Sequence, residues 1–94
     1  MLKTLEDLVN IIRERKSSSD ETSYTSKLLK DKSLSVEKVK EEISELIEAV
    51  ENNSNKIHEA ADVLYHLLVY LEGNGVRIED IMDELEKRKK KKES

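Results

Sequence analysis

The chain has 94 residues, of which 40% are charged and only 3% aromatic, and its formal net charge is −4. It contains no cysteine, which excludes disulfide bonds, thiol nucleophiles and cysteine-ligated zinc. The negative charge argues against nucleic-acid binding, which depends on neutralising phosphates. No apolar run approaches the roughly 20 residues of a membrane span, and the N-terminus lacks the apolar region of a signal peptide. A cytoplasmic protein is therefore expected.

The composition also favours one fold class. Proline is absent and glycine occurs twice, which favours helices over a β-sandwich or barrel. We expect a single all-α domain over residues 1–94, built from four or five helices. A chain of this size has a modest core, so we expect dimerisation to complete the bundle.

The first half of the chain contains three predicted helices. Residues 4–16 form the first, with Thr4 as its N-cap. A polar loop, residues 17–22, leads to a short helix over residues 23–30. The third helix runs from about Ser35 to Asn52, capped by Ser33 or Ser35. The apolar stripe of the first helix is Leu5, Leu8, Ile11 and Ile12, and that of the third is Val36, Val39, Ile43, Leu46, Ile47 and Val50.

Two more helices follow in the second half. Residues 52–55 form a short turn, which makes the third helix and the fourth, residues 56–72, antiparallel neighbours. Residues 73–75, Gly-Asn-Gly, supply a left-handed cap and a turn. The basic run over residues 87–92 is interpreted as a cationic helix C-terminus rather than a phosphate or RNA contact. The last helix begins near Ile78, and its residues Ile78, Ile81, Met82 and Leu85 are expected to face inward.

The fourth helix is apolar nearly all round, yet it carries an acidic stripe. A helix of this kind is usually buried. Glu59, Asp62 and His66 fall within roughly 60° of one another on it. A buried carboxylate needs a cation, a basic partner or a neutralising proton. The ordinary alternative is an exposed first turn, where carboxylates favour the helix dipole.

The third helix carries a matching pair of carboxylates. Glu42 and Glu45 are one turn apart and lie on one face, which taken alone is usually a solvated surface. The antiparallel hairpin, however, brings this pair opposite Glu59 and Asp62. Oxygen ligands without cysteine suit a hard cation, Mg²⁺ or Mn²⁺. Without a metal, the facing carboxylates would raise one another's pKa values and destabilise the fold.

Two other kinds of metal site fit the sequence less well. The segment from His58 to Asp62 resembles the zinc-peptidase helix motif, but Asp62 stands in place of the second histidine, and zinc favours nitrogen and sulfur ligands. A di-iron bundle would need Glu-x-x-His pairs, and the sequence has none.

Several stretches of the sequence resemble a known enzyme family. The arrangement E-x-x-E, a spacer over residues 46–58, and E-x-x-D resembles the all-α nucleotide pyrophosphohydrolases of the MazG-like superfamily. More narrowly, the chain resembles phosphoribosyl-ATP pyrophosphatase of histidine biosynthesis. The stretches that carry this likeness are Ser23-Tyr24-Thr25 with Lys27-Leu28-Leu29, Lys38-Val39 with Glu41-Glu42, and Glu59-Ala60-Ala61-Asp62-Val63-Leu64-Tyr65-His66-Leu67-Leu68, with Thr4 to Leu8 and Ile12 to Lys16 extending it to the N-terminus.

The resemblance implies a four- to five-helix MazG-like bundle and a homodimer. It also implies Mg²⁺-dependent hydrolysis of phosphoribosyl-ATP to phosphoribosyl-AMP and pyrophosphate, by attack of water on the α–β phosphoanhydride. Glu41 would orient or deprotonate that water. The metal ligands would be Glu42, Glu45, Glu59 and Asp62. Ser23, Thr25, Lys27, Lys38 and His66 would bind the substrate, with Lys30 as a further cation.

Ordinary structural roles and other functions fit some of the same residues. Ser23 and Thr25 would serve equally as helix caps, and His66 as a core histidine with satisfied hydrogen bonds. Lys40 stands where phosphoribosyl-ATP pyrophosphatase typically has glycine, and residues 43–49 resemble a MazG-type helix more closely. A house-cleaning nucleoside-triphosphate pyrophosphohydrolase is therefore the alternative enzyme. A non-enzymatic helical dimerisation module is the alternative of a different class.

Overall fold

The computed structural model describes residues 2–18 and 22–92, and every regular element in these ranges is an α-helix. The all-α prediction is therefore confirmed. The predicted polar loop includes residues 19–21, which lie outside the described residues. No described helix has the length and apolar character needed to cross a membrane. The helices are α1 (Lys3–Ser17), α2 (Tyr24–Lys30), α3 (Lys32–Asn52), α4 (Lys56–Gly73) and α5 (Ile78–Lys92).

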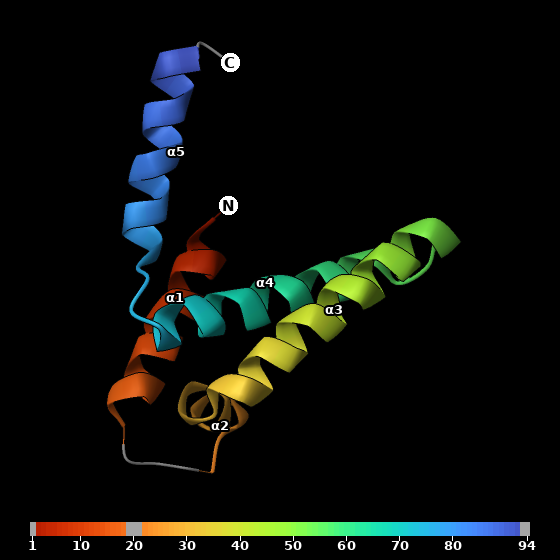
Figure 1. The fold of residues 1–94 in the computed structure, drawn as a ribbon, viewed down its shortest axis with the longest axis horizontal. Coiled ribbons are helices and arrows are strands. Elements are labelled where there is room, and N and C mark those ends of the chain that lie inside the picture. Colours follow the sequence, from red (N-terminus) through yellow and green to blue (C-terminus); the bar gives the residue numbers. More distant parts are fainter. Residues whose placement is uncertain (1, 19–21, 93–94) are drawn as a thin grey trace.

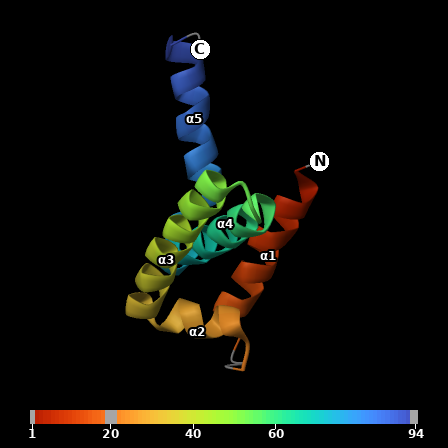
Figure 2. The ribbon, with the colours of Figure 1, turned by 90° about the vertical axis from the view of Figure 1, so that its right-hand side faces the viewer.

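The fourth helix, α4, contacts each of the other four helices. It forms the predicted antiparallel hairpin with α3, and the far end of this hairpin projects beyond α1 and α2 (Figure 1). The short helix α2 lies across the base, between α1 and α3 (Figure 2). The last helix, α5, points away from the rest of the chain in both views.

The apolar core lies where α1, α2 and α4 meet. It consists of Val9, Ile12, Leu28, Leu68 and Val69, all of them buried. The periodicity of α1 predicted Ile11 on the inner face, but Ile11 is 46% exposed. Val9 takes its place in the core because α1 packs against both α2 and α4, which shifts the covered face by a fraction of a turn.

The ends of the helices differ in detail from the prediction. The first helix begins at Lys3, one residue before the predicted cap Thr4, and no side chain caps it. The third begins at Lys32, and Asp31 is its cap, with Oδ1 accepting a hydrogen bond from the Leu34 amide at 3.1 Å. The predicted cap after α4 is confirmed, because Gly75 has a φ of +76°, a conformation that glycine adopts without steric cost.

Two predicted apolar stripes are only partly covered by the described chain. On α3, Ile43, Ile47 and Val50 are 41–56% exposed. On α5, Met82 and Leu85 were expected to face inward, but each is 49% exposed. Helical periodicity shows which face is apolar, but these faces extend past the elements that could cover them.

Candidate metal and nucleotide site

The α3–α4 hairpin brings the two predicted carboxylate pairs together. Ligand atoms of Glu41, Glu42 and Glu45 lie within 4.8 Å of one another, and so do those of His58, Glu59 and Asp62. The two groups also act on each other across the hairpin. Burial raises the pKa of Glu42 most, and the charge of Asp62 on the facing helix adds to this effect. Burial also raises the pKa of Glu45 most, and the charge of Glu59 on the facing helix raises it further. We call Glu42, Glu45, Glu59 and Asp62 the carboxylate cluster.

The deepest member of the carboxylate cluster is Glu42, which is 7% exposed. Burial raises the pKa of its carboxyl, and the nearby charge of Glu45 adds to this effect. Among the described residues, two buried side-chain oxygens have no hydrogen-bond partner, Oε1 of Glu42 and Oε1 of Glu59. Buried polar atoms are normally paired. Two unpaired carboxylate oxygens on facing helices therefore suit a bound hard cation.

Glu41 differs sharply from its neighbour Glu42. Its side chain is exposed, and its Oε1 accepts a hydrogen bond from Lys38 Nζ at 2.8 Å. This bond lowers the pKa of Glu41 and raises the pKa of Lys38. Two predicted site residues are thus paired with each other at the edge of the cluster, and both carry their charges at neutral pH.

His66 lies one turn beyond Asp62 and joins α4 to α2. Its Nδ1 lies 2.8 Å from the Asp62 carbonyl oxygen, and its Nε2 lies 3.0 Å from the Tyr24 hydroxyl. The hydroxyls of Thr25 and Tyr65 form a second bond between the same helices. The rings of Tyr24 and Tyr65 stack at a centroid separation of 6.3 Å, and both meet the His66 ring edge to face. These contacts hold α2 beside the carboxylate cluster.

The remaining predicted substrate residues lie on α2 or at its start. Ser23 is the N-cap of α2, and its Oγ accepts from the Ser26 amide at 3.0 Å. Lys27 is exposed, on the following turn. The residues that sequence reasoning missed here are Tyr24 and Tyr65, although both lie inside the stretches that carry the family resemblance.

A second polar cluster, also missed from the sequence, holds α5 in place. Arg13 donates to Glu72 Oε2 at 2.9 Å and to Glu79 Oε1 at 2.6 Å, and Lys16 Nζ donates to the Glu72 carbonyl at 2.6 Å. The Arg13 bond lowers the pKa of Glu79 to about 2. Arg13 and Glu72 are 59 residues apart, so no local pattern could reveal the contact.

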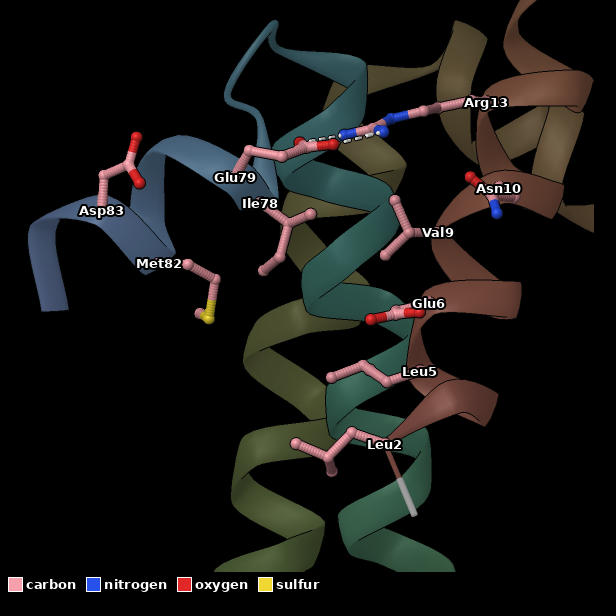
Figure 3. Close-up of a pocket in the computed structure, with 10 residues that line it drawn as sticks. All are labelled: Leu2, Leu5, Glu6, Val9, Asn10, Arg13, Ile78, Glu79, Met82 and Asp83. Carbon is pink, nitrogen blue, oxygen red and sulfur yellow. Dashed lines mark hydrogen bonds and ion pairs between the residues drawn. The ribbon is translucent and has the colours of Figure 1, made fainter. Parts of the chain in front are cut away.

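Beside this cluster, a groove of about 490 Å³ separates α1 from α5. Figure 3 shows Leu5, Val9, Ile78 and Met82 turned toward it, with the Arg13–Glu79 pair at one end. None of the residues lining it belongs to the carboxylate cluster. The groove therefore gives no evidence of where a nucleotide binds.

Comparison with known proteins relates this chain to an enzyme family. The family model for phosphoribosyl-ATP pyrophosphohydrolase matches residues 5–89. A phosphoribosyl-ATP pyrophosphatase of Methylobacterium nodulans is 47% identical over 90% of this chain and 82% of its own length. The enzyme of that name from Sulfurisphaera tokodaii is 44% identical over 92% of this chain and 95% of its own length.

A bifunctional relative matches over a smaller share of its own length. The histidine biosynthesis bifunctional protein HisIE of Pyrococcus furiosus is 42% identical over 95% of this chain, but the match covers 43% of that protein. No solved structure matches the chain. The family model and the full-length relatives together show that the chain belongs to the phosphoribosyl-ATP pyrophosphohydrolase family.

Proposed function

We propose that the chain hydrolyses phosphoribosyl-ATP to phosphoribosyl-AMP and pyrophosphate, an early step of histidine biosynthesis. The observation that carries this proposal is the family match over residues 5–89, together with full-length relatives that bear the enzyme's name. We also propose that the reaction takes place in the cytoplasm, because its substrate derives from ATP.

The carboxylate cluster is the proposed Mg²⁺ site, with Mn²⁺ as an alternative of similar ligand preference. The unpaired Oε1 atoms of Glu42 and Glu59 support it, because each is a buried acceptor facing other carboxylates. When bound, Mg²⁺ would offset phosphate charge and lower the pKa of a coordinated water. The residues that would hold it are Glu42, Glu45, Glu59 and Asp62.

The side chains around the cluster supply the other functions that the reaction needs. Glu41 stays ionised beside Lys38, which suits a group that orients or deprotonates water. Lys38 stays cationic and, with Lys27, would offset the charge of phosphate oxygens. Thr25 and the His66 ring lie at the junction of α2 and α4, where they would border the bound nucleotide.

The working form is proposed to be a homodimer. The exposed faces of α3 and α4 carry a set of half-exposed aliphatic side chains on the projecting hairpin. A monomer rarely leaves so many large apolar side chains together in water, and burying them against a second copy removes that cost. We call this set the hairpin apolar face: Ile43, Ile47, Val50, Ile57 and Leu64, which are 41–88% exposed.

Product analysis tests the proposed reaction directly. The purified chain is incubated with Mg²⁺ and, in separate reactions, with phosphoribosyl-ATP, dUTP, dCTP or ATP, and pyrophosphate is measured. We expect pyrophosphate from phosphoribosyl-ATP alone. Cleavage of the ordinary nucleotides instead would identify a house-cleaning pyrophosphohydrolase, and no cleavage by a folded, metal-loaded protein would favour a dimerisation module.

Conservative variants test the site within the same assay. Asp62→Asn keeps the shape of the side chain but removes its charge, so hydrolysis should fall about 100-fold or more if Asp62 holds the metal. Asp83→Asn on α5, outside the cluster, serves as the matched control and should retain full activity. Undiminished hydrolysis by the Asp62 variant would show that the metal lies elsewhere.

A further inference from the structure

His58 lies at the solvent side of the carboxylate cluster, and the proposed reaction gives it no role. It is the third residue of α4, and its Nε2 lies 3.4 Å from Asp62 Oδ2. One ligand atom from each of His58, Glu59 and Asp62 lies within 4.8 Å of the other two. The same segment carries the partial likeness to the zinc-peptidase helix motif. The structure thus places an imidazole nitrogen among the proposed carboxylate ligands.

The spacing of these atoms matches that of ligands around one ion. A small divalent ion holds nitrogen and oxygen ligands at about 2.1 Å, so neighbouring ligand atoms in an octahedral shell lie about 3 Å apart. The 3.4 Å between His58 Nε2 and Asp62 Oδ2 is close to this value, and a small side-chain rotation closes the gap. Residues spaced i,i+4 lie on one face of a helix, a spacing that paired metal ligands on helices also use.

Unpaired buried oxygens in the same cluster point independently to a cation. Glu42 is 7% exposed, and its Oε1 has no hydrogen-bond partner among the described residues. The same is true of Oε1 of Glu59, which is also a member of the group that contains His58. Buried acceptors are normally paired, so a cation that satisfied these oxygens would lie beside the imidazole. The His58 side chain, 72% exposed, would complete its coordination from the solvent side.

We propose that His58 Nε2 is an additional metal ligand in this chain, and that the site therefore binds a transition-metal dication such as Mn²⁺ more tightly than Mg²⁺. This role rests on the proposed metal site, to which it adds one ligand. Imidazole nitrogen suits transition metals, whereas Mg²⁺ prefers oxygen and keeps several of its waters. Mg²⁺ therefore gains little by exchanging a water for the imidazole, and the added nitrogen favours the transition metal.

The sequence makes a metal-bound imidazole easy to assign, because the chain has two histidines. The other one, His66, is 7% exposed, and both of its ring nitrogens have partners within the chain. Its Nδ1 lies 2.8 Å from the Asp62 carbonyl oxygen, and its Nε2 lies 3.0 Å from the Tyr24 hydroxyl. The His58 side chain is mostly exposed, so His58→Ala should leave the fold intact. Circular dichroism checks that the variant keeps its helices.

Two measurements on the purified, metal-free chain test the role of His58. Calorimetric titration with Mn²⁺ and, separately, with Mg²⁺ gives the two affinities. Electron spin echo spectroscopy of the Mn²⁺-loaded protein detects the ¹⁴N nucleus of a coordinated imidazole. In the wild type we expect this ¹⁴N signal and tighter binding of Mn²⁺ than of Mg²⁺. In His58→Ala the signal should vanish, and the Mn²⁺ affinity should fall about tenfold or more while the Mg²⁺ affinity changes less than about twofold.

Lys56→Ala is the matched control, because it truncates another exposed side chain in the first turn of α4. It should keep the ¹⁴N signal and the preference for Mn²⁺ over Mg²⁺.

The possible failures can be told apart. Mn²⁺ binding without a ¹⁴N signal, or a signal that persists in His58→Ala, would overturn the role of His58 and leave the metal site standing. An equal loss of both affinities in His58→Ala would also overturn it, since a nitrogen ligand acts mainly on the transition metal. A wild type that binds neither ion would overturn the metal site as well. None of these measurements depends on hydrolysis, so they are independent of the proposed substrate.

Discussion

Adjacent residues on α3 have opposite electrostatic environments. Glu41 is exposed and bonded to Lys38, which lowers its pKa, whereas burial raises the pKa of Glu42. Neighbours on a helix point about 100° apart, so one faces solvent and a lysine while the other faces α4. Pairs of carboxyls whose pKa values are pushed apart are suited to different roles, which fits the proposed roles of Glu41 as a water-orienting base and Glu42 as a metal ligand.

Glu42→Gln should therefore stabilise the metal-free protein and abolish its response to metal. Because the folded-state pKa of Glu42 is raised, its ionised form disfavours folding at neutral pH, and this penalty fades as the pH falls and the carboxyl is protonated. A neutral amide avoids the penalty, so the melting temperature in EDTA should rise at pH 7. The rise produced by millimolar Mg²⁺ in the wild type should disappear, and hydrolysis should fall about 100-fold or more.

Glu48→Gln, an exposed change on the same helix, is the control for this experiment and should keep the response to Mg²⁺. A Glu42→Gln protein that still gains thermal stability from Mg²⁺ would contradict the ligand assignment. Scanning calorimetry in EDTA and in millimolar Mg²⁺ gives the melting temperatures of each protein, and the pyrophosphate assay gives the rate of hydrolysis.

The contact between Arg13 and Glu79 predicts a loss of stability in acid. Hydrogen bonds from Arg13 lower the pKa of Glu79 to about 2, from its ordinary value of 4.5. A carboxyl with a depressed folded-state pKa stabilises the fold above its unfolded pKa, and this contribution disappears as the pH falls from about 4.5 toward 2. Glu79→Gln should be less stable than the wild type at pH 7, and the difference should vanish near pH 2. Urea unfolding of both proteins between pH 7 and pH 2 measures this difference in stability. A difference that does not depend on pH would refute an ionic origin.

At the scale of elements, the start of α3 shows how a local cap is chosen. The sequence pattern favoured Ser33 or Ser35 as the N-cap. Helix α3 instead begins at Lys32, because the Asp31 side chain accepts a hydrogen bond from the Leu34 amide. Ser35 is buried within the helix. Several residues in this region have side chains able to cap, so the position of α2 decides which of them does.

The cap assignment predicts a difference between two alanine variants. Asp31→Ala should lower the free energy of unfolding by about 1 kcal/mol, because an amide loses its partner. Ser33→Ala should change it by less than about 0.5 kcal/mol, since Ser33 is an exposed helix residue. Chemical denaturation of both variants makes the comparison, and a larger effect at Ser33 would restore the cap predicted from sequence.

At the scale of the whole molecule, one chain leaves two apolar surfaces open. One is the hairpin apolar face, and the other is the groove between α1 and α5 seen in Figure 3. The helix α5 extends outward from the Arg13 contact and so leaves Met82 and Leu85 half exposed. A single chain of this length has too few elements to cover these surfaces.

The homodimer proposal predicts that one charge on the hairpin apolar face separates the subunits. Ile47 is 55% exposed, and in a two-fold interface Ile47→Glu would place a carboxylate on both sides of the contact. Light scattering after size exclusion should give the mass of two chains for the wild type and of one for the variant. Val76→Glu, at a 41% exposed site outside this face, should remain dimeric. A monomeric wild type would refute the proposal.

Much of the fold and of the carboxylate cluster could be predicted because the signals are local. Helical periodicity and the turn over residues 52–55 located the α3–α4 hairpin, and i,i+3 spacing placed Glu42 with Glu45 and Glu59 with Asp62. The antiparallel connection then required the two pairs to face each other. Each step depends on residues a few positions apart or on one short turn.

Only the tertiary structure decided which contacts join distant parts of the chain. Arg13 with Glu72, and Tyr24 with His66, are 59 and 42 residues apart, and no periodicity relates them. The sequence by itself determined the helices, their apolar faces and the facing acidic pairs, because backbone geometry repeats over short distances. Which apolar faces are covered and which carboxylate oxygens stay unpaired depended on how the helices pack, since packing sets the neighbours and the access of water at each site.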